Sequence, residues 1–248
     1  MFVLKAPSAR VGLAAIVAAA GMAAVSQAQA ADYLNSLELL SQDNFRSLSE
    51  NVGSGISFKG IVPAEGLGIT GFDINAFATA IEVKDRGLWR NASRGVEVDK
   101  WVPMTGVRLH KGLPGNVDVG GFYSQSSRDI KAYGGELRWA FIEGNTFLPA
   151  VAVRGSMSKL TGIDQLKLTT TGIDLSISKG ILMFTPYAGI GKVWVQSTPQ
   201  NVPGLKKESF SLNKAFIGLN INLGINLALE ADRTGDVSSY SVKAGIRF

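Results

Sequence analysis

The chain has 248 residues, of which 46% are hydrophobic and only 18% charged, with a formal net charge of +5 and no cysteine. A soluble domain carries about 25% charged residues, so this composition is unusually apolar. The missing cysteines exclude a disulfide framework, a thiol nucleophile and a Cys-ligated metal. Beyond the N-terminal stretch no apolar run reaches the length of a membrane-spanning helix, which excludes a helical membrane protein.

Residues 1–30 have the layout of a secretory signal peptide. Lys5 and Arg10 form a basic region, Val11 to Val25 are apolar, and Ala28-Gln29-Ala30 is a small-residue cleavage motif. The alternative is an N-terminal membrane anchor, but the apolar run is short and ends in that motif. We expect residues 1–30 to be removed on export.

Residues 31–68 predict a helical segment ahead of the strands. Apolar residues recur at helical spacing among Ser, Asn, Asp and Glu: Leu34, Leu37, Leu40, Phe45 and Leu48. Ser41 and Asp43 are both candidate N-caps, and 56–62 is a candidate short strand. We expect this segment to plug the lumen of a barrel or to cap it on the periplasmic side. A solvated leader is the alternative.

From residue 69 to 248 the chain alternates between apolar and polar or small residues. This period of two predicts strands. Ten are expected, near 69–83, 103–112, 116–125, 130–142, 148–159, 167–179, 183–196, 209–223, 226–234 and 238–248. Their length fits a tilted strand that crosses a bilayer, which favours a membrane barrel over a soluble β-sandwich.

The last nine residues carry the most specific pattern. An aromatic C-terminal residue follows apolar or small residues at every second position: Tyr240, Val242, Ala244, Ile246 and Phe248. With the signal peptide and the strands, this ending resembles that of Gram-negative outer-membrane β-barrel proteins, of the small porin-like or OmpA-type class. The resemblance implies outer-membrane lipid and the outer-membrane assembly machinery as partners, and an outer-membrane location. It does not predict an oligomeric state.

The expected fold is therefore all-β: a transmembrane antiparallel up-and-down barrel of about ten strands, with an N-terminal amphipathic helix. Twelve strands are the alternative. In this class periplasmic turns are short and extracellular loops long. The longest connections, 84–102 and 197–208, then fall outside the cell, and the turns at 113–116, 143–147 and 223–225 fall in the periplasm.

If the apolar face looks outward, the lumen receives a mixed set of charges. The expected lumen network is Asp73, Arg108, His110, Asp118, Glu136, Arg138, Arg154, Asp174, Lys192, Lys214, Glu230, Asp232, Lys243 and Arg247. Phe77, Phe122, Ile190 and Phe216 are expected beside them. Because neither sign dominates, the pattern predicts a closed, salt-bridged interior or a narrow pore of weak ion selectivity. The apolar residues leave binding or uptake of small hydrophobic molecules as the alternative function.

Catalysis is the third and weakest hypothesis. The chain has one histidine, His110, with no neighbouring serine, and a general acid–base mechanism needs a partner within reach. Glu136 and Asp118 form a candidate carboxylate pair, but lumen carboxylates of this kind commonly form ion pairs. We therefore expect no catalytic residues, no metal site, no cofactor and no nucleic-acid partner.

Overall fold

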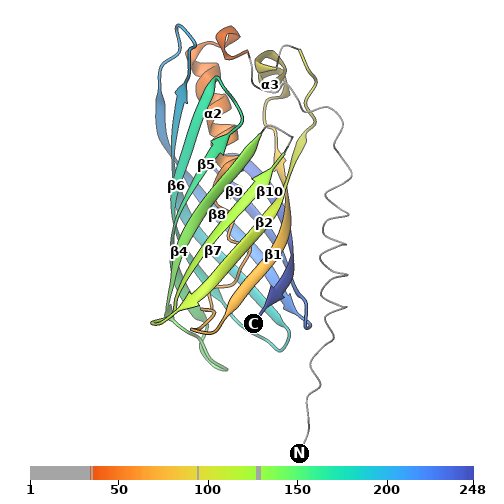
Figure 1. Ribbon diagram of the computed structural model, residues 1–248, viewed down its shortest axis with the longest axis vertical. Helices are drawn as coiled ribbons and strands as arrows, with labels where there is room; N and C mark the ends of the chain where they lie inside the picture. The colour runs from red at the N-terminus through yellow and green to blue at the C-terminus, as the bar shows by residue number, and fades with distance from the viewer. Residues whose placement is uncertain (1–33, 35, 94, 127–129) are drawn as a thin grey trace, which may run out of the picture.

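The computed structural model describes residue 34 and residues 36–93, 95–126 and 130–248. The expected signal peptide, 1–30, lies outside the described residues. Within them the chain forms a closed antiparallel barrel (Figure 1), in which each strand pairs with its neighbours in sequence and the last pairs with the first.

Ten strands make up the wall. They are β1 (Phe72–Glu82), β2 (Trp101–Leu113), β3 (Val117–Gln125), β4 (Lys131–Ile142), β5 (Ala150–Thr161), β6 (Leu166–Ser178), β7 (Phe184–Pro199), β8 (Glu208–Asn222), β9 (Asn226–Thr234) and β10 (Val237–Arg247). The strand prediction is confirmed in number and type, and the bounds differ from those expected by no more than three residues. Closure leaves no strand edge unpaired, as a hydrocarbon environment requires.

The two ends of the barrel differ. The C-terminus and the short turns at 114–116 and 223–225 lie at one end, called the lower end after its place in Figure 1. The long connections 83–100 and 200–207 lie at the opposite, upper end. This division follows the expected alternation of short and long connections.

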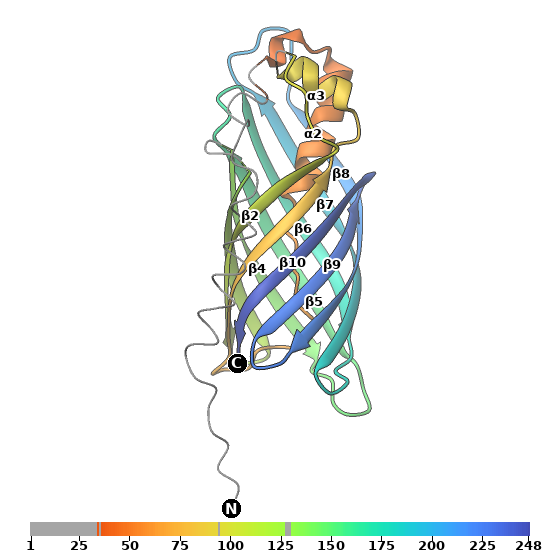
Figure 2. The same ribbon diagram turned by 90° about the vertical axis from the view of Figure 1, so that its right-hand side faces the viewer.

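Helices gather at the upper end (Figure 2). A 3₁₀ turn, η1 (Leu37–Leu39), precedes helix α2 (Gln42–Ile56), and a further helix, α3 (Arg86–Ala92), lies in the connection between β1 and β2. Of the two candidate caps, the structure uses Ser41, whose Oγ accepts a hydrogen bond from the Asn44 backbone at 3.3 Å. No helix in the described part of the chain is both long and apolar enough to cross a membrane.

Two features differ from the sequence prediction. Residues 56–62 are not a strand: α2 continues to Ile56, and the chain beyond it forms no ladder because the closed barrel leaves no edge to pair with. Helix α3 was not predicted. Its signal was Asp85, whose carboxylate caps the helix by accepting from the Leu88 backbone at 2.9 Å.

Alternate residues face the outside and the lumen along each strand. The outward face carries a band of exposed large apolar side chains, including Ile74, Leu109, Leu137, Ile190 and Ile217. Exposed aromatic side chains mark its lower margin at Trp139, Phe141, Phe184 and Phe248, and its upper margin at Tyr123, Tyr133, Trp194 and Tyr240. An apolar band between two aromatic girdles is the outer surface of a transmembrane barrel.

The lumen has two layers. Its upper part is apolar, where Phe45 and Leu48 of α2 pack among wall residues such as Leu168 and Val195. Its lower part is lined by buried charged side chains. Residues 57–71 lead from α2 through this lower layer to β1 and are called the lumenal segment below.

Candidate functional site

Most of the charges expected in the lumen are there. Buried on the inward face are Asp73, Arg108, His110, Asp118, Glu136, Arg138, Arg154, Asp174, Lys214, Glu230, Asp232 and Lys243. The Arg247 side chain, 11% exposed, approaches Asp73 at 4.0 Å. Strand alternation and the register place these side chains, since neighbouring strands present inward residues in rows around the wall.

The prediction that Lys192 faces the lumen is wrong. It is exposed on the outer wall, because Val193 and Val195 are the inward residues of β7 at this level. Ile190 has the same parity and is 65% exposed. The error arose because Gly189 and Gly191 interrupt the apolar alternation of β7 and hide its phase. Among the described residues, the strands of the wall thus present six of these acidic side chains to the lumen against six Lys and Arg side chains, besides His110.

Arg154 is the centre of one buried cluster. Its guanidinium contacts Asp174 Oδ2 at 2.8 Å and Glu136 Oε2 at 3.3 Å. Lys214 reaches the same Asp174 oxygen at 3.2 Å. A Cβ on Gly191 would lie 2.2 Å from Asp174 Oδ1, so the missing side chain makes room for this cluster. Each buried charge therefore has an opposite partner, which offsets its loss of hydration.

Two further ion pairs lie on the β1 to β4 and β10 side of the wall, and His110 adjoins the Arg154 cluster through Glu136. Lys243 Nζ binds Asp73 Oδ2 at 2.7 Å, and Arg138 pairs with Asp118. His110 Nε2 lies 2.9 Å from Glu136 Oε1. The two atoms form no hydrogen bond, and the contact is an ion pair only when the imidazole is protonated.

The lumenal segment is held by these same clusters. Lumen cations donate to its backbone carbonyls: Lys214 Nζ to Phe58 at 2.7 Å, Arg108 Nη1 to Gly60 at 2.5 Å and Arg138 Nη1 to Pro63 at 2.5 Å. Extended chain without a ladder exposes carbonyls that must be satisfied, and these cations satisfy them.

Lumen acids and hydroxyls bind the opposite groups of the segment. The backbone amide of Ile61 donates to Glu230 Oε2 at 2.8 Å, that of Ala64 to Ser178 Oγ at 3.0 Å and that of Leu67 to Asp118 Oδ1 at 3.0 Å. Lys59 Nζ forms a buried ion pair with Asp232 at 3.0 Å. Near the lower end Arg247 donates to the Glu65 carbonyl at 3.3 Å.

An aromatic pocket encloses one of the cations. The guanidinium carbon of Arg108 lies 4.9 Å from the ring centre of Phe58, 4.7 Å from that of Phe77 and 5.7 Å from that of Phe122. Phe58 belongs to the lumenal segment, and its ring meets Phe122 edge-on at 5.4 Å. Cation–π contact of this kind is favourable where water is excluded. The segment thus completes the surroundings of Arg108.

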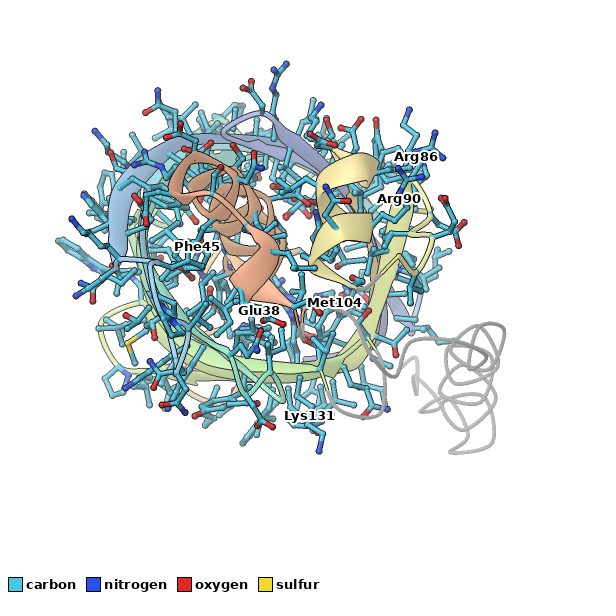
Figure 3. The ribbon with its side chains drawn as sticks, turned by 90° about the horizontal axis from the view of Figure 1, so that it is seen from above. Glu38, Phe45, Arg86, Arg90, Met104 and Lys131 are labelled. Carbon is cyan, nitrogen blue, oxygen red and sulfur yellow. The ribbon has the colours of Figure 1, made fainter. Side chains whose placement is uncertain are left out.

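Helix α2 is inside the ring of strands at the upper end, as Figure 3 shows from above, with Phe45 on it. The residues predicted for its apolar face and for the turn before it, Leu34, Leu37, Leu40, Phe45 and Leu48, are all buried. Ser49 Oγ donates to Ser197 Oγ of β7 at 2.7 Å. Arg46 pairs with Glu50 and Glu208, and the hydrogen bond to Glu50 is the main cause that raises the pKa of Arg46.

Several contact residues were not predicted. Phe58, Lys59 and Gly60 fall within the predicted short strand 56–62, and Tyr187 is not among the residues predicted for the lumen. Tyr187 is instead buried, and its hydroxyl donates to Glu230 at 3.1 Å. Its inward parity on β7 was the available signal. The described residues contain no group of three His, Asp or Glu placed to hold a metal ion.

The closed antiparallel wall, the outward apolar band and the polar lumen together define a β-barrel of the outer-membrane class. No protein-family model and no curated protein matches the chain. Several solved structures resemble it. The N-terminal barrel domain of Pseudomonas aeruginosa OprF is 12% identical, with 73% of this chain and 99% of that one covered, at a TM-score of 0.37.

Two other solved structures give a similar result. The Yersinia pestis outer membrane protein Ail in a nanodisc is 12% identical, with 71% of this chain and 99% of that one covered, at a TM-score of 0.36. The P. aeruginosa outer membrane protein OprG is 9% identical, with 75% and 97% covered, at a TM-score of 0.30. At such scores these likenesses carry no argument about what this chain does.

Proposed function

We propose that this chain is a non-enzymatic barrel of the outer membrane whose lumen is closed at rest by its own N-terminal residues, 36–71, acting as a plug. The observation that carries the proposal is the set of contacts between the lumenal segment and the lumen charges. Lys214, Arg108 and Arg138 donate to its carbonyls, and Glu230 and Asp118 accept from its amides. Both signs of lumen charge are therefore engaged.

The strength of these contacts favours lasting closure. A hydrogen bond to a charged group contributes about 1.5–3 kcal/mol, and the segment makes several of them in a buried setting. Withdrawal would also remove Phe58 from Arg108 and Lys59 from Asp232. If the segment does withdraw, water must enter to solvate the charges. The path so opened would be narrow and of weak selectivity, since acids and bases in the described lumen are balanced.

Planar-bilayer conductance tests the proposal. We expect the mature protein to be silent and a variant lacking residues 31–66 to conduct. A matched variant, Ser49→Cys with Ser197→Cys, joins α2 to β7 where the two Oγ atoms are 2.7 Å apart. Any channel openings that this variant shows should vanish when its cysteine pair is oxidised and return when a reductant is added.

Two outcomes would overturn the proposal. One is a stable conductance of the mature protein that is also seen in the cysteine variant after oxidation. The ion path would then bypass the plug. The other is a deletion variant that folds, as judged by its heat-dependent gel shift, but stays silent. In that case the wall itself would close the lumen.

Uptake of small hydrophobic molecules has less support. A space of about 60 Å³ lies between α2 and the wall, near Val52, Trp89 and Met104. This volume is of the order of two water molecules, so a hydrophobic ligand would require α2 to move. His110 faces Glu136 in the buried charge network, which favours a structural role for it over catalysis.

We further propose that the upper end faces the outside of the cell and the lower end the periplasm. The native chain has no cysteine, so single introduced cysteines report topology without background. We expect Leu39→Cys, at a site 65% exposed on the upper end, to react with a membrane-impermeant maleimide on intact cells. Leu182→Cys, at a site 97% exposed on the lower end, should react only after lysis. The reverse pattern would refute the orientation.

The C-terminal residues fit the proposed recognition by the assembly machinery. Tyr240, Ile246 and Phe248 are exposed on the outward face, and Val242 and Ala244 lie between them on the same face. An outward aromatic C-terminus is accessible to a partner before the barrel enters the membrane.

A further inference from the structure

The outer wall carries a hollow that the lumen does not explain. It measures about 670 Å³ and lies over β5 to β9. Its floor includes Leu175, Ile190 and Ala215, which are apolar and face outward. In the ladder Ala215 stands between Ile190 of β7 and Arg233 of β9. The small side chain of Ala215 leaves a depression between two larger neighbours, of a shape that suits an acyl chain.

Polar side chains line the upper part of the same hollow. Lys192, Asn213 and Arg233 all border it. Lys192 pairs with Asn213 across the ladder, and the Asn213 carbonyl accepts from the Gly235 amide at 2.8 Å. Lys192 and Asn213 therefore lie side by side on β7 and β8, and Arg233 lies one outward position away from that row, on the adjacent β9.

These residues lie at the level of the upper aromatic girdle. Trp194 follows Lys192 by two residues on the same outward face, and Tyr240 is opposite Ala231, two residues from Arg233. Aromatic girdles lie at the height of the lipid headgroups. The cations thus lie where a lipid phosphate is found and the apolar floor where its acyl chains begin.

The cations have donors to spare. Among the described residues Lys192 has neither an ion pair nor a hydrogen-bond partner, whereas the lumen lysines Lys214 and Lys243 are both paired. Arg233 Nη2 pairs with Asp236 at 2.9 Å and its Nε donates to the Gly235 carbonyl, but its side chain stays 64% exposed. With Asp236 counted, one positive charge remains unmatched at the edge of an apolar wall.

We propose that this hollow binds one phosphate-bearing anionic membrane lipid. Lys192 and Arg233 contact the phosphate, Asn213 donates to its oxygens, and an acyl chain lies over Leu175, Ile190 and Ala215. Charge complementarity and the match of polar and apolar parts to a lipid select this occupant over a protein segment. The site is on the outer wall and does not depend on closure of the lumen.

Native mass spectrometry of the mature protein in a non-ionic detergent tests the site, with phosphatidylglycerol as the probe. We expect one tightly retained lipid, with affinity lowered about tenfold or more in Lys192→Gln with Arg233→Gln. The control is Lys167→Gln with Lys207→Gln, which removes the same charge from two exposed upper-end lysines that do not border the hollow. This control should bind as the wild type does.

Each other outcome overturns the proposal. If the Lys192→Gln, Arg233→Gln variant binds the lipid as tightly as the wild type does, the lipid is retained unspecifically. An equal loss in the control variant means that only net charge matters. Competition by inorganic phosphate at millimolar concentration means that the site takes a free anion, and retention of phosphatidylcholine as strong as that of phosphatidylglycerol removes the role of charge.

Discussion

Arg154→Ala is expected to cost about 3–5 kcal/mol of unfolding free energy, the range found when one partner of a buried ion pair is removed. The guanidinium is buried and contacts both Asp174 and Glu136. Without it, Lys214 remains beside Asp174 and His110 beside Glu136, but the wall loses the ion pairs by which Arg154 of β5 joins Glu136 of β4 to Asp174 of β6. The loss is read from urea unfolding in detergent, followed by tryptophan fluorescence.

Arg90→Ala is the matched control. Arg90 is 52% exposed at its side chain and pairs with Glu97 at 3.3 Å, and exposed pairs contribute about 0–1 kcal/mol. A cost for Arg154→Ala no larger than that for Arg90→Ala would show that the lumen cluster does not stabilise the barrel.

Gly60→Ala is expected to unseat the plug while leaving the wall intact. A Cβ at this position would lie 1.8 Å from Arg154 Nη1. The tip of an arginine is ordinarily free to move, but this one is held by Asp174 and Glu136. Either Arg154 gives up those ion pairs or the segment shifts away from the wall, and the bond from Arg108 to the Gly60 carbonyl is then strained as well. We expect the mature variant to conduct in planar bilayers under conditions in which the wild type is silent.

Gly66→Ala provides the comparison within the same segment. There the nearest atom to an added Cβ is 3.7 Å away, which is ordinary van der Waals contact. It should remain silent and keep its gel shift. If Gly60→Ala is also silent and as stable as the wild type, the lumenal segment tolerates displacement at its tightest point, and it does not act as a seal.

The wall was predictable because its signal is repeated along the chain. A period of two, turn residues between strands and a lipid-facing apolar face each constrain the same assignment. The phase error on β7 occurred where glycine occupies the inward positions, as at Gly189 and Gly191 beside the outward Ile190 and Lys192. A glycine has no side chain to show which face it occupies, so the alternation loses its reference.

The plug, residues 36–71, was only partly predictable. Leu37, Phe45 and Leu48 indicated a buried helix face, which the structure confirms. Phe58, Lys59 and Gly60 alternate like a strand, yet their partners are Arg108, Asp232 and Arg154, far away in sequence and on three different strands. Local pattern carries no information on such pairings.

The sequence alone therefore determined the class of fold, the number of strands and most of the inward charges, because each follows from local periodicity and from the closure that a bilayer imposes. Only the tertiary structure decided what the charges bind. Closure of the wall brings Lys214, Arg108 and Arg138 around a chain segment whose carbonyls have no ladder, and buried cations and buried carbonyls each need a partner once water is excluded.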